Sequence, residues 1–122
     1  MILAALALAA QSPDRPHQEI EWRPVTQNQF ERVSVAPASI ERDGDNRSFL
    51  LRTVARRSAS GAAMNVSRLR INCALNTVTL LSLTDYREDG SQISFRETTS
   101  EERGMTAFLP PNNPIRNAVC SP

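Results

Sequence analysis

Lysine is absent from this 122-residue sequence, in which all fourteen basic residues are arginine. A chain without lysine cannot form a lysine Schiff base, and it cannot carry the phosphate-binding loop whose motif ends in Gly-Lys. Acidic residues number thirteen, so the formal net charge is only +1. Dedicated nucleic-acid-binding domains are usually strongly basic, and we therefore expect no nucleic-acid partner.

Residues that carry catalysis or hold metal ions are also scarce. Histidine occurs once, at His17, in a polar segment that contains prolines, and there are two cysteines, Cys73 and Cys120. These three residues do not show the ligand spacing of a zinc site. A nucleophile–histidine pair would have to use His17, which precedes the expected folded region. We predict that the protein is not an enzyme and takes no metal or cofactor.

The longest apolar run lies at the N-terminus, where residues 2–10 are all apolar. This run is too short to cross a bilayer as a helix, which needs about 20 residues, so we expect no transmembrane segment. An apolar run that ends in small residues, here Ala7-Leu8-Ala9, is typical of a secretory signal peptide. We divide the chain into a signal peptide (1–10), a flexible linker (11–20) and one folded domain (21–122). The alternative is that the run forms an N-terminal helix of the fold.

An even number of cysteines in an exported chain predicts one disulfide, Cys73–Cys120. The loop that it closes has nearly fifty residues, for which the chain-entropy model gives about 4 kcal/mol of stabilisation. Two separate buried thiols are the alternative, and this alternative gains weight if the leader is not a signal peptide. Leader and disulfide together predict an exported protein, either periplasmic or at the cell surface or secreted.

Alternating apolar residues predict β-strands along the whole domain, and Phe49 and Leu51 share the expected core face of their strand. Only six residues are aromatic, so the core must rest mainly on Leu, Ile and Val. Residues 43–46 are expected to form a hairpin turn, in which Gly44 and Asn46 tolerate the positive φ that such turns need. A phase shift between Leu80 and Leu81 predicts a β-bulge or two covered faces. The expected strands cover 30–36, 40–42, 47–56, 62–73, 77–86 and 93–96.

A short helix is expected at the C-terminus, with Asn113 as N-cap and Pro114 as the first helical residue. Its apolar residues follow at helical spacing: Ile115, Ala118 and Val119. A helix this short is unstable alone, so it must dock on the sheet, where Cys120 would tether it to the strand of Cys73. We predict an α+β, mainly β fold. It is a single antiparallel sheet of five or six strands, with the C-terminal helix packed on one face and tied by the disulfide.

Four arginines fall on the polar faces of two consecutive predicted strands: Arg52, Arg56, Arg68 and Arg70. If these strands pair, the four side chains form one basic patch. Such a patch could bind an acidic surface, a polysaccharide or a protein. The alternative is a solvated face on which the arginines pair with nearby acids.

The region from Trp22 to Cys120 resembles the surface-adhesin protein E family of exported bacterial proteins. The resemblance rests on an ordered set of residues: Trp22, Ser39-Ile40-x-Arg42, Cys73, Tyr86, Gly90, Pro114 and Cys120. It implies a small antiparallel sheet with a C-terminal helix held by a disulfide. It also implies binding to host extracellular-matrix or plasma proteins and the ability to form a homodimer.

Two functions from different classes follow from these observations. The first is an exported, non-catalytic, adhesin-like module that binds host or envelope proteins through a sheet face or an exposed edge. The second is a soluble periplasmic structural or small-ligand-binding protein that shares only the scaffold. The second is motivated by the apolar run, because no cysteine that could carry a lipid anchor follows it directly.

Overall fold

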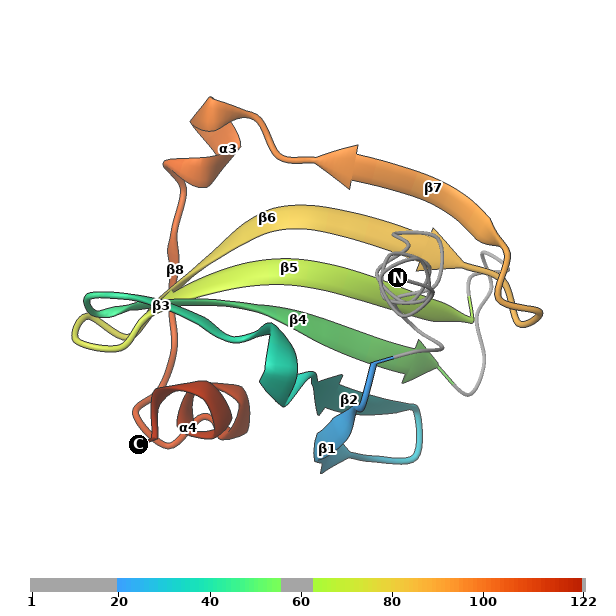
Figure 1. Cartoon of the computed structure of the whole chain (residues 1–122), viewed down its shortest axis with the longest axis horizontal. Coiled ribbons are helices and arrows are strands. Elements are labelled where there is room, and N and C mark those ends of the chain that lie inside the picture. Colours follow the sequence, from blue (N-terminus) through green and yellow to red (C-terminus); the bar gives the residue numbers. More distant parts are fainter. Residues whose placement is uncertain (1–19, 56–62, 122) are drawn as a thin grey trace, which may run out of the picture.

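The structure is a computed structural model and describes residues 20–55 and 63–121. Its main element is one antiparallel sheet in which six strands form a continuous path, in the order β1-β2-β4-β5-β6-β7. Figure 1 shows the long central strands curving together, with β7 along the edge of the sheet far from α4. The strands are β1 (Arg23–Gln27), β2 (Glu31–Val35), β3 (Glu41–Asp43), β4 (Asn46–Ala55), β5 (Met64–Asn72), β6 (Thr77–Tyr86), β7 (Gln92–Glu97) and β8 (Ala107–Phe108). The helical elements are the 3₁₀-helix η1 (Pro37–Ser39), α3 (Ser100–Arg103) and α4 (Pro114–Cys120).

The mainly β, antiparallel fold with a Cys73–Cys120 disulfide is confirmed, but the predicted strand count was too low. The sheet has eight strands rather than five or six. The strands missing from the prediction are β1, which contains Pro24, and the two-residue β8. Neither strand shows a clear alternation of apolar and polar residues. Each forms because a neighbouring strand, β2 for β1 and β6 for β8, offers backbone hydrogen-bond partners. β8 pairs with the start of β6, at Thr77 and Val78, where β7 does not reach.

The hairpin between β3 and β4 turns as the sequence predicts. Asp43 pairs with Asn46, which leaves Gly44 and Asp45 as a two-residue loop. Gly44 has φ 60°, a conformation that glycine adopts without the steric cost of a Cβ. Asn46 has no positive φ and belongs to β4. The turn therefore needs glycine at one position only.

The sheet has two chemically different faces, which the strand register defines. Phe49 and Leu51 on β4 lie on the same face as Ile71 on β5, and all three are buried. We call this the helix face, because Val119 of α4 packs into the same core cluster. The opposite face carries Arg52, and we call it the arginine face. The period-two pattern of the sequence placed the core on the correct side of β4 and β5.

The predicted irregularity in β6 is a β-bulge. Leu69 pairs with Leu80, but the next pair is Arg68 with Ser82, so Leu81 is an extra residue. Thr98 fastens this point, because its hydroxyl donates to the carbonyls of Leu80 and Leu81 at 2.8 and 3.0 Å. The bulge is thus held from the segment that follows β7.

The helix α4 begins and docks much as expected. Asn113 is the N-cap, and its side-chain oxygen accepts hydrogen bonds from the backbone N–H groups of Ile115 and Arg116. Val119 is buried and Ile115 packs against the core cluster. Ala118 is exposed, so the expectation that it also faces the sheet was wrong. The helix has seven residues, and the apolar residues that it packs toward the sheet are Ile115 and Val119.

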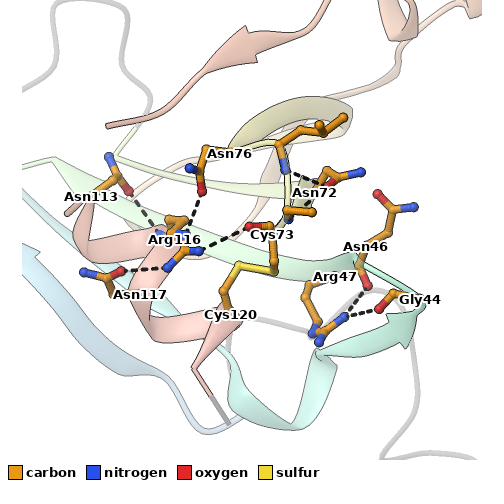
Figure 2. The surroundings of a disulfide bond; sticks show 12 residues. Gly44, Asn46, Arg47, Asn72, Cys73, Asn76, Asn113, Arg116, Asn117 and Cys120 are labelled. Carbon is orange, nitrogen blue, oxygen red and sulfur yellow. Dashed lines mark hydrogen bonds between the residues drawn. A yellow bond between two sulfur atoms is a disulfide. The ribbon is translucent and has the colours of Figure 1, made fainter. Parts of the chain in front are cut away.

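The disulfide and one arginine together fix α4 to the turn between β5 and β6. Figure 2 shows Cys73 and Cys120 joined beside Arg116, which points from α4 toward that turn. Arg116 donates to the side-chain oxygen of Asn76 at 2.9 Å and to the carbonyl of Cys73 at 3.2 Å. Asn76 itself has φ 56°. The covalent bond is therefore supported by a polar clamp on the same two elements.

Some expectations fall on residues that the structure does not describe. The predicted signal peptide, 1–10, and the predicted linker up to residue 19 lie outside the described residues, as does Arg56 of the proposed basic patch. Among the residues that are described, no helix is long and apolar enough to cross a membrane.

Candidate functional site on the arginine face

The arginine face brings together three of the four residues of the predicted basic patch. Arg68 pairs with Leu50 across β4–β5, and Arg70 pairs with Ser48. Arg52 pairs with Val66, so it lies diagonally from Arg68, at the separation of about 7–8 Å expected for Cα atoms of diagonal neighbours. Arg52, Arg68 and Arg70 are all half-buried.

These arginines are not neutralised by acids in the described part of the chain. Within 20–55 and 63–121, the side chains of Arg68 and Arg70 form no hydrogen bond or ion pair with protein groups. The ion pair that does occur in these ranges is Arg96–Glu102, and Arg96 points to the helix face because it pairs with Leu83. Half-buried guanidinium groups without protein acceptors must be satisfied by water or by a ligand.

A cavity of about 690 Å³ opens on the arginine face beside Arg68. It spans β4 to β7 around the bulge of β6. Its apolar lining consists of Leu50, Val66, Leu81, Tyr86 and Phe95. Its charged lining consists of Arg68, Glu97 and Arg103. The volume lies within the range of about 300–1,000 Å³ that is typical of small-molecule sites.

The strand register explains why these side chains converge. Val66 pairs with Thr84, and Thr84 pairs with Phe95, so three neighbouring strands place side chains in one row across the face. Tyr86 pairs with Met64 and continues the wall toward the end of β6. Phe95 is 54% exposed although it lines the cavity, so a large aromatic surface is available to a ligand.

One rim of the cavity is built by α3 and the residue before it. Thr99 and Glu102 form a capping box, in which Thr99 accepts from the Glu102 N–H and Glu102 accepts from the Thr99 N–H. The carboxylate of Glu102 accepts hydrogen bonds from the backbone N–H of Thr99 and from the side chain of Arg96. These bonds, the one from Thr99 most strongly, hold the pKa of Glu102 below its ordinary value. The cap fixes the following residue, Arg103, whose Nε donates to Thr98 at 2.9 Å and whose Nη2 donates to the Leu81 carbonyl at 3.2 Å.

The far end of the arginine face is closed by Trp22, which precedes β1. The guanidinium carbon of Arg52 lies 4.9 Å from the centroid of the Trp22 ring, which is a cation–π arrangement. Burial lowers the pKa of Arg52, and the positive charge of Arg32 lowers it further. The side chain of Arg52 forms no hydrogen bond in the part of the chain that the structure describes.

Sequence reasoning found the arginines but missed the residues that shape the cavity. Tyr86 and Phe95 were assigned to predicted strands, and Tyr86 also to the family pattern. Arg103 was assigned to no element, and none of the three was proposed as a binding residue. The capping-box spacing of Thr99 and Glu102 was a readable signal for α3. Phe95 lies two strands away from Val66, with Thr84 between them, and this row depends on strand order and register, which a single sequence does not give.

Metal binding has no visible basis among the residues that the structure describes. In residues 20–55 and 63–121, no three His, Cys, Asp or Glu side chains gather in an arrangement that could hold a metal ion. Both cysteines are joined in the disulfide, so neither offers a thiolate. What the arginine face offers is a partly apolar cavity lined by Arg68, whose side chain has no hydrogen bond or ion pair among the described residues. Its chemistry suits binding of an anion with an apolar body.

Comparison of the chain with protein-family models, with curated proteins and with solved structures found no significant match.

Proposed function

We propose that this chain is an exported, non-catalytic binding protein whose cavity on the arginine face holds a small amphipathic anion. The observation that carries the proposal is Arg68, a half-buried guanidinium in the cavity wall with no hydrogen bond or ion pair among the described residues. Export is supported by the disulfide, because such bonds persist in oxidising compartments.

The cavity combines an apolar lining with one guanidinium that has no partner among the described residues, and this combination defines the expected ligand. Val66, Tyr86 and Phe95 offer apolar and aromatic contacts to a ring or hydrocarbon body. Arg68 offers donors in the planar arrangement that matches a carboxylate, sulfonate or phosphate group. Glu97 on β7 lies in the same cross-strand row as Arg68, with Ser82 between them, and its carboxylate disfavours a second negative charge in the cavity. The expected ligand is therefore an organic molecule with one anionic end.

Fluorescence titration with 1-anilinonaphthalene-8-sulfonate tests this proposal, because that probe has an aromatic body and one sulfonate. A hydrogen bond to a charged group is worth about 1.5–3 kcal/mol. Arg68→Gln should therefore raise the Kd of the probe by about ten- to a hundredfold. The uncharged analogue N-phenyl-1-naphthylamine should bind the parent and Arg68→Gln equally.

The matched control is Arg42→Gln, which removes the same charge from an exposed position on β3. Arg42 pairs with Arg47, and Arg47 pairs with Ile71, so Arg42 belongs to the helix face. Because the cavity lies on the arginine face, the loss of Arg42 should leave probe binding unchanged. Equal weakening by both variants would mean that net charge, and not the cavity, attracts the probe. Unchanged binding by Arg68→Gln would exclude Arg68 as the anion partner.

A second candidate function is adhesin-like protein binding at the edge of the sheet, as the resemblance to surface-adhesin protein E implies. The observation that favours it is β7, an end strand of the sheet whose six residues are all exposed. Ile93 is an exposed apolar residue on this edge, and unpaired edges of this kind can accept a partner strand.

Binding to immobilised extracellular-matrix and envelope proteins tests the second candidate. Ile93→Lys should abolish binding, because a lysine on an edge strand opposes strand addition. Leu75→Lys is the control, since Leu75 is an exposed apolar residue in the β5–β6 turn. If both variants bind like the parent, the β7 edge is not the contact. Size measurement in solution would show whether the same edge joins two copies.

A further inference from the structure

Three polar groups are buried without an acceptor at one end of the arginine face. They are the indole N–H of Trp22, the hydroxyl of Ser34 and the Nε–H of Arg52. Each can donate a hydrogen bond, and in the described part of the chain none does so. Ser34 is only 1% exposed, so bulk water does not solvate it. Buried donors are satisfied in the great majority of native proteins, and a group of three that are not requires an explanation.

The three groups belong to one local arrangement. Ser34 pairs directly with Arg52 across β2–β4, and Pro24 of β1 pairs with Ser34. Trp22 lies two residues before Pro24 and therefore on the same face, where its ring stacks on the Arg52 guanidinium at 4.9 Å. Three adjacent strand segments thus bring an indole, a hydroxyl and a guanidinium together.

The charge of this cluster is also uncompensated. The neighbouring charge that acts on Arg52 is Arg32, which is positive, and both burial and Arg32 lower the Arg52 pKa. Arg32 itself donates to the side-chain oxygen of Gln27, which is neutral. An anion placed at the cluster would relieve the repulsion and accept the free donors at the same time.

We propose that Trp22, Ser34 and Arg52 form a subsite for an oxyanion, the terminal group of a phosphate, sulfonate or carboxylate. The Trp22 ring orients the guanidinium by stacking on it, and the free N–H groups of Arg52 can donate hydrogen bonds to two oxygens of one anion. Ser34 and the indole N–H donate to the remaining oxygens. The subsite goes beyond the cavity ligand, because its three residues do not line the cavity.

The cluster adjoins the cavity through Val66, which lines the cavity and pairs with Arg52. The oxyanion can therefore be free in solution or can be the end of a larger molecule that enters from the cavity. The chemistry recognised at the cluster is the same in both cases.

Trp22 is the only tryptophan in the sequence, so its fluorescence reports directly on the subsite. Inorganic phosphate should change the emission of Trp22 saturably at constant ionic strength set with chloride. It should also raise the melting temperature, since a ligand that binds the folded state stabilises it. Arg52→Gln and Ser34→Ala should each raise the Kd for phosphate about tenfold or more, and Arg42→Gln should not change it.

The inference is overturned if phosphate causes no saturable change beyond that of chloride. It is also overturned if folded Ser34→Ala and Arg52→Gln bind phosphate like the parent. Ser34→Ala removes one hydroxyl that has no partner in the described structure, so this variant should fold even if Arg52→Gln does not. Binding of 1-anilinonaphthalene-8-sulfonate is measured on the same variants. Intact probe binding without phosphate binding rejects the subsite and leaves the cavity proposal standing.

Competition between the two ligands identifies the source of the oxyanion. If phosphate binds and does not displace the fluorescent probe, the subsite takes a free oxyanion. If phosphate binds and the probe is displaced, the sulfonate of the probe occupies the same cluster.

Discussion

Removal of the Cys73–Cys120 disulfide should cost about 4 kcal/mol of folding free energy. The two cysteines are 47 residues apart, and the chain-entropy model for a loop of that length gives about 4 kcal/mol at 25 °C. A domain of this size has a total stability of about 5–15 kcal/mol. The bond therefore supplies a large share of the stability. The helix α4 is too short to persist alone, so it should loosen first.

Urea unfolding of a Cys73→Ala/Cys120→Ala variant measures this cost. With an m-value of about 2 kcal/mol/M, the midpoint should fall by about 2 M. The reduced parent protein is the matched control and should unfold at the same midpoint as the variant. A fall of less than about 0.3 M would refute the reasoning, because the entropy that the unfolded chain gains when the loop is opened would then not affect stability.

Four further substitutions test separate parts of the structure. Phe49→Ala should destabilise the protein by about 3–5 kcal/mol, because Phe49 is fully buried, and thermal unfolding would show it. Phe95→Ala should leave the melting temperature nearly unchanged, since Phe95 is half-exposed, yet weaken probe binding. Asn113→Ala removes the N-cap of α4 and should cost about 1 kcal/mol in urea unfolding. Glu102→Gln should lower stability at pH 7, and the difference from the parent should shrink as the pH falls from the ordinary pKa of 4.5 through the lower pKa of the folded protein. A pH-independent difference would exclude the carboxylate as its cause.

The parts of the fold that depend on local chemistry could be predicted from the sequence. Alternation placed Phe49 and Leu51 in the core, and the phase shift at Leu80 and Leu81 marked the bulge. The N-cap at Asn113 was also correct. Each of these signals depends on residues within a few positions of one another.

The parts that depend on distant pairing could not be predicted in the same way. β8 exists because β6 offers unpaired backbone at Thr77 and Val78, and its two residues carry no pattern of their own. The stacking of Trp22 on Arg52 requires β2 to pair with β4 although β3 lies between them in the sequence, and the cavity requires Arg103 to return to Leu81 of β6. A single sequence showed which arginines share a face, but not which side chains converge around them.

The central claim is that the arginine face holds an amphipathic anion, and NMR chemical-shift mapping tests it most directly. Amide resonances of the ¹⁵N-labelled protein are followed during titration with 1-anilinonaphthalene-8-sulfonate. We expect the largest shifts at Val66, Arg68, Thr84 and Phe95, which line the cavity. Saturable shifts confined to the helix face, around Val119 and Ile71, would contradict the claim.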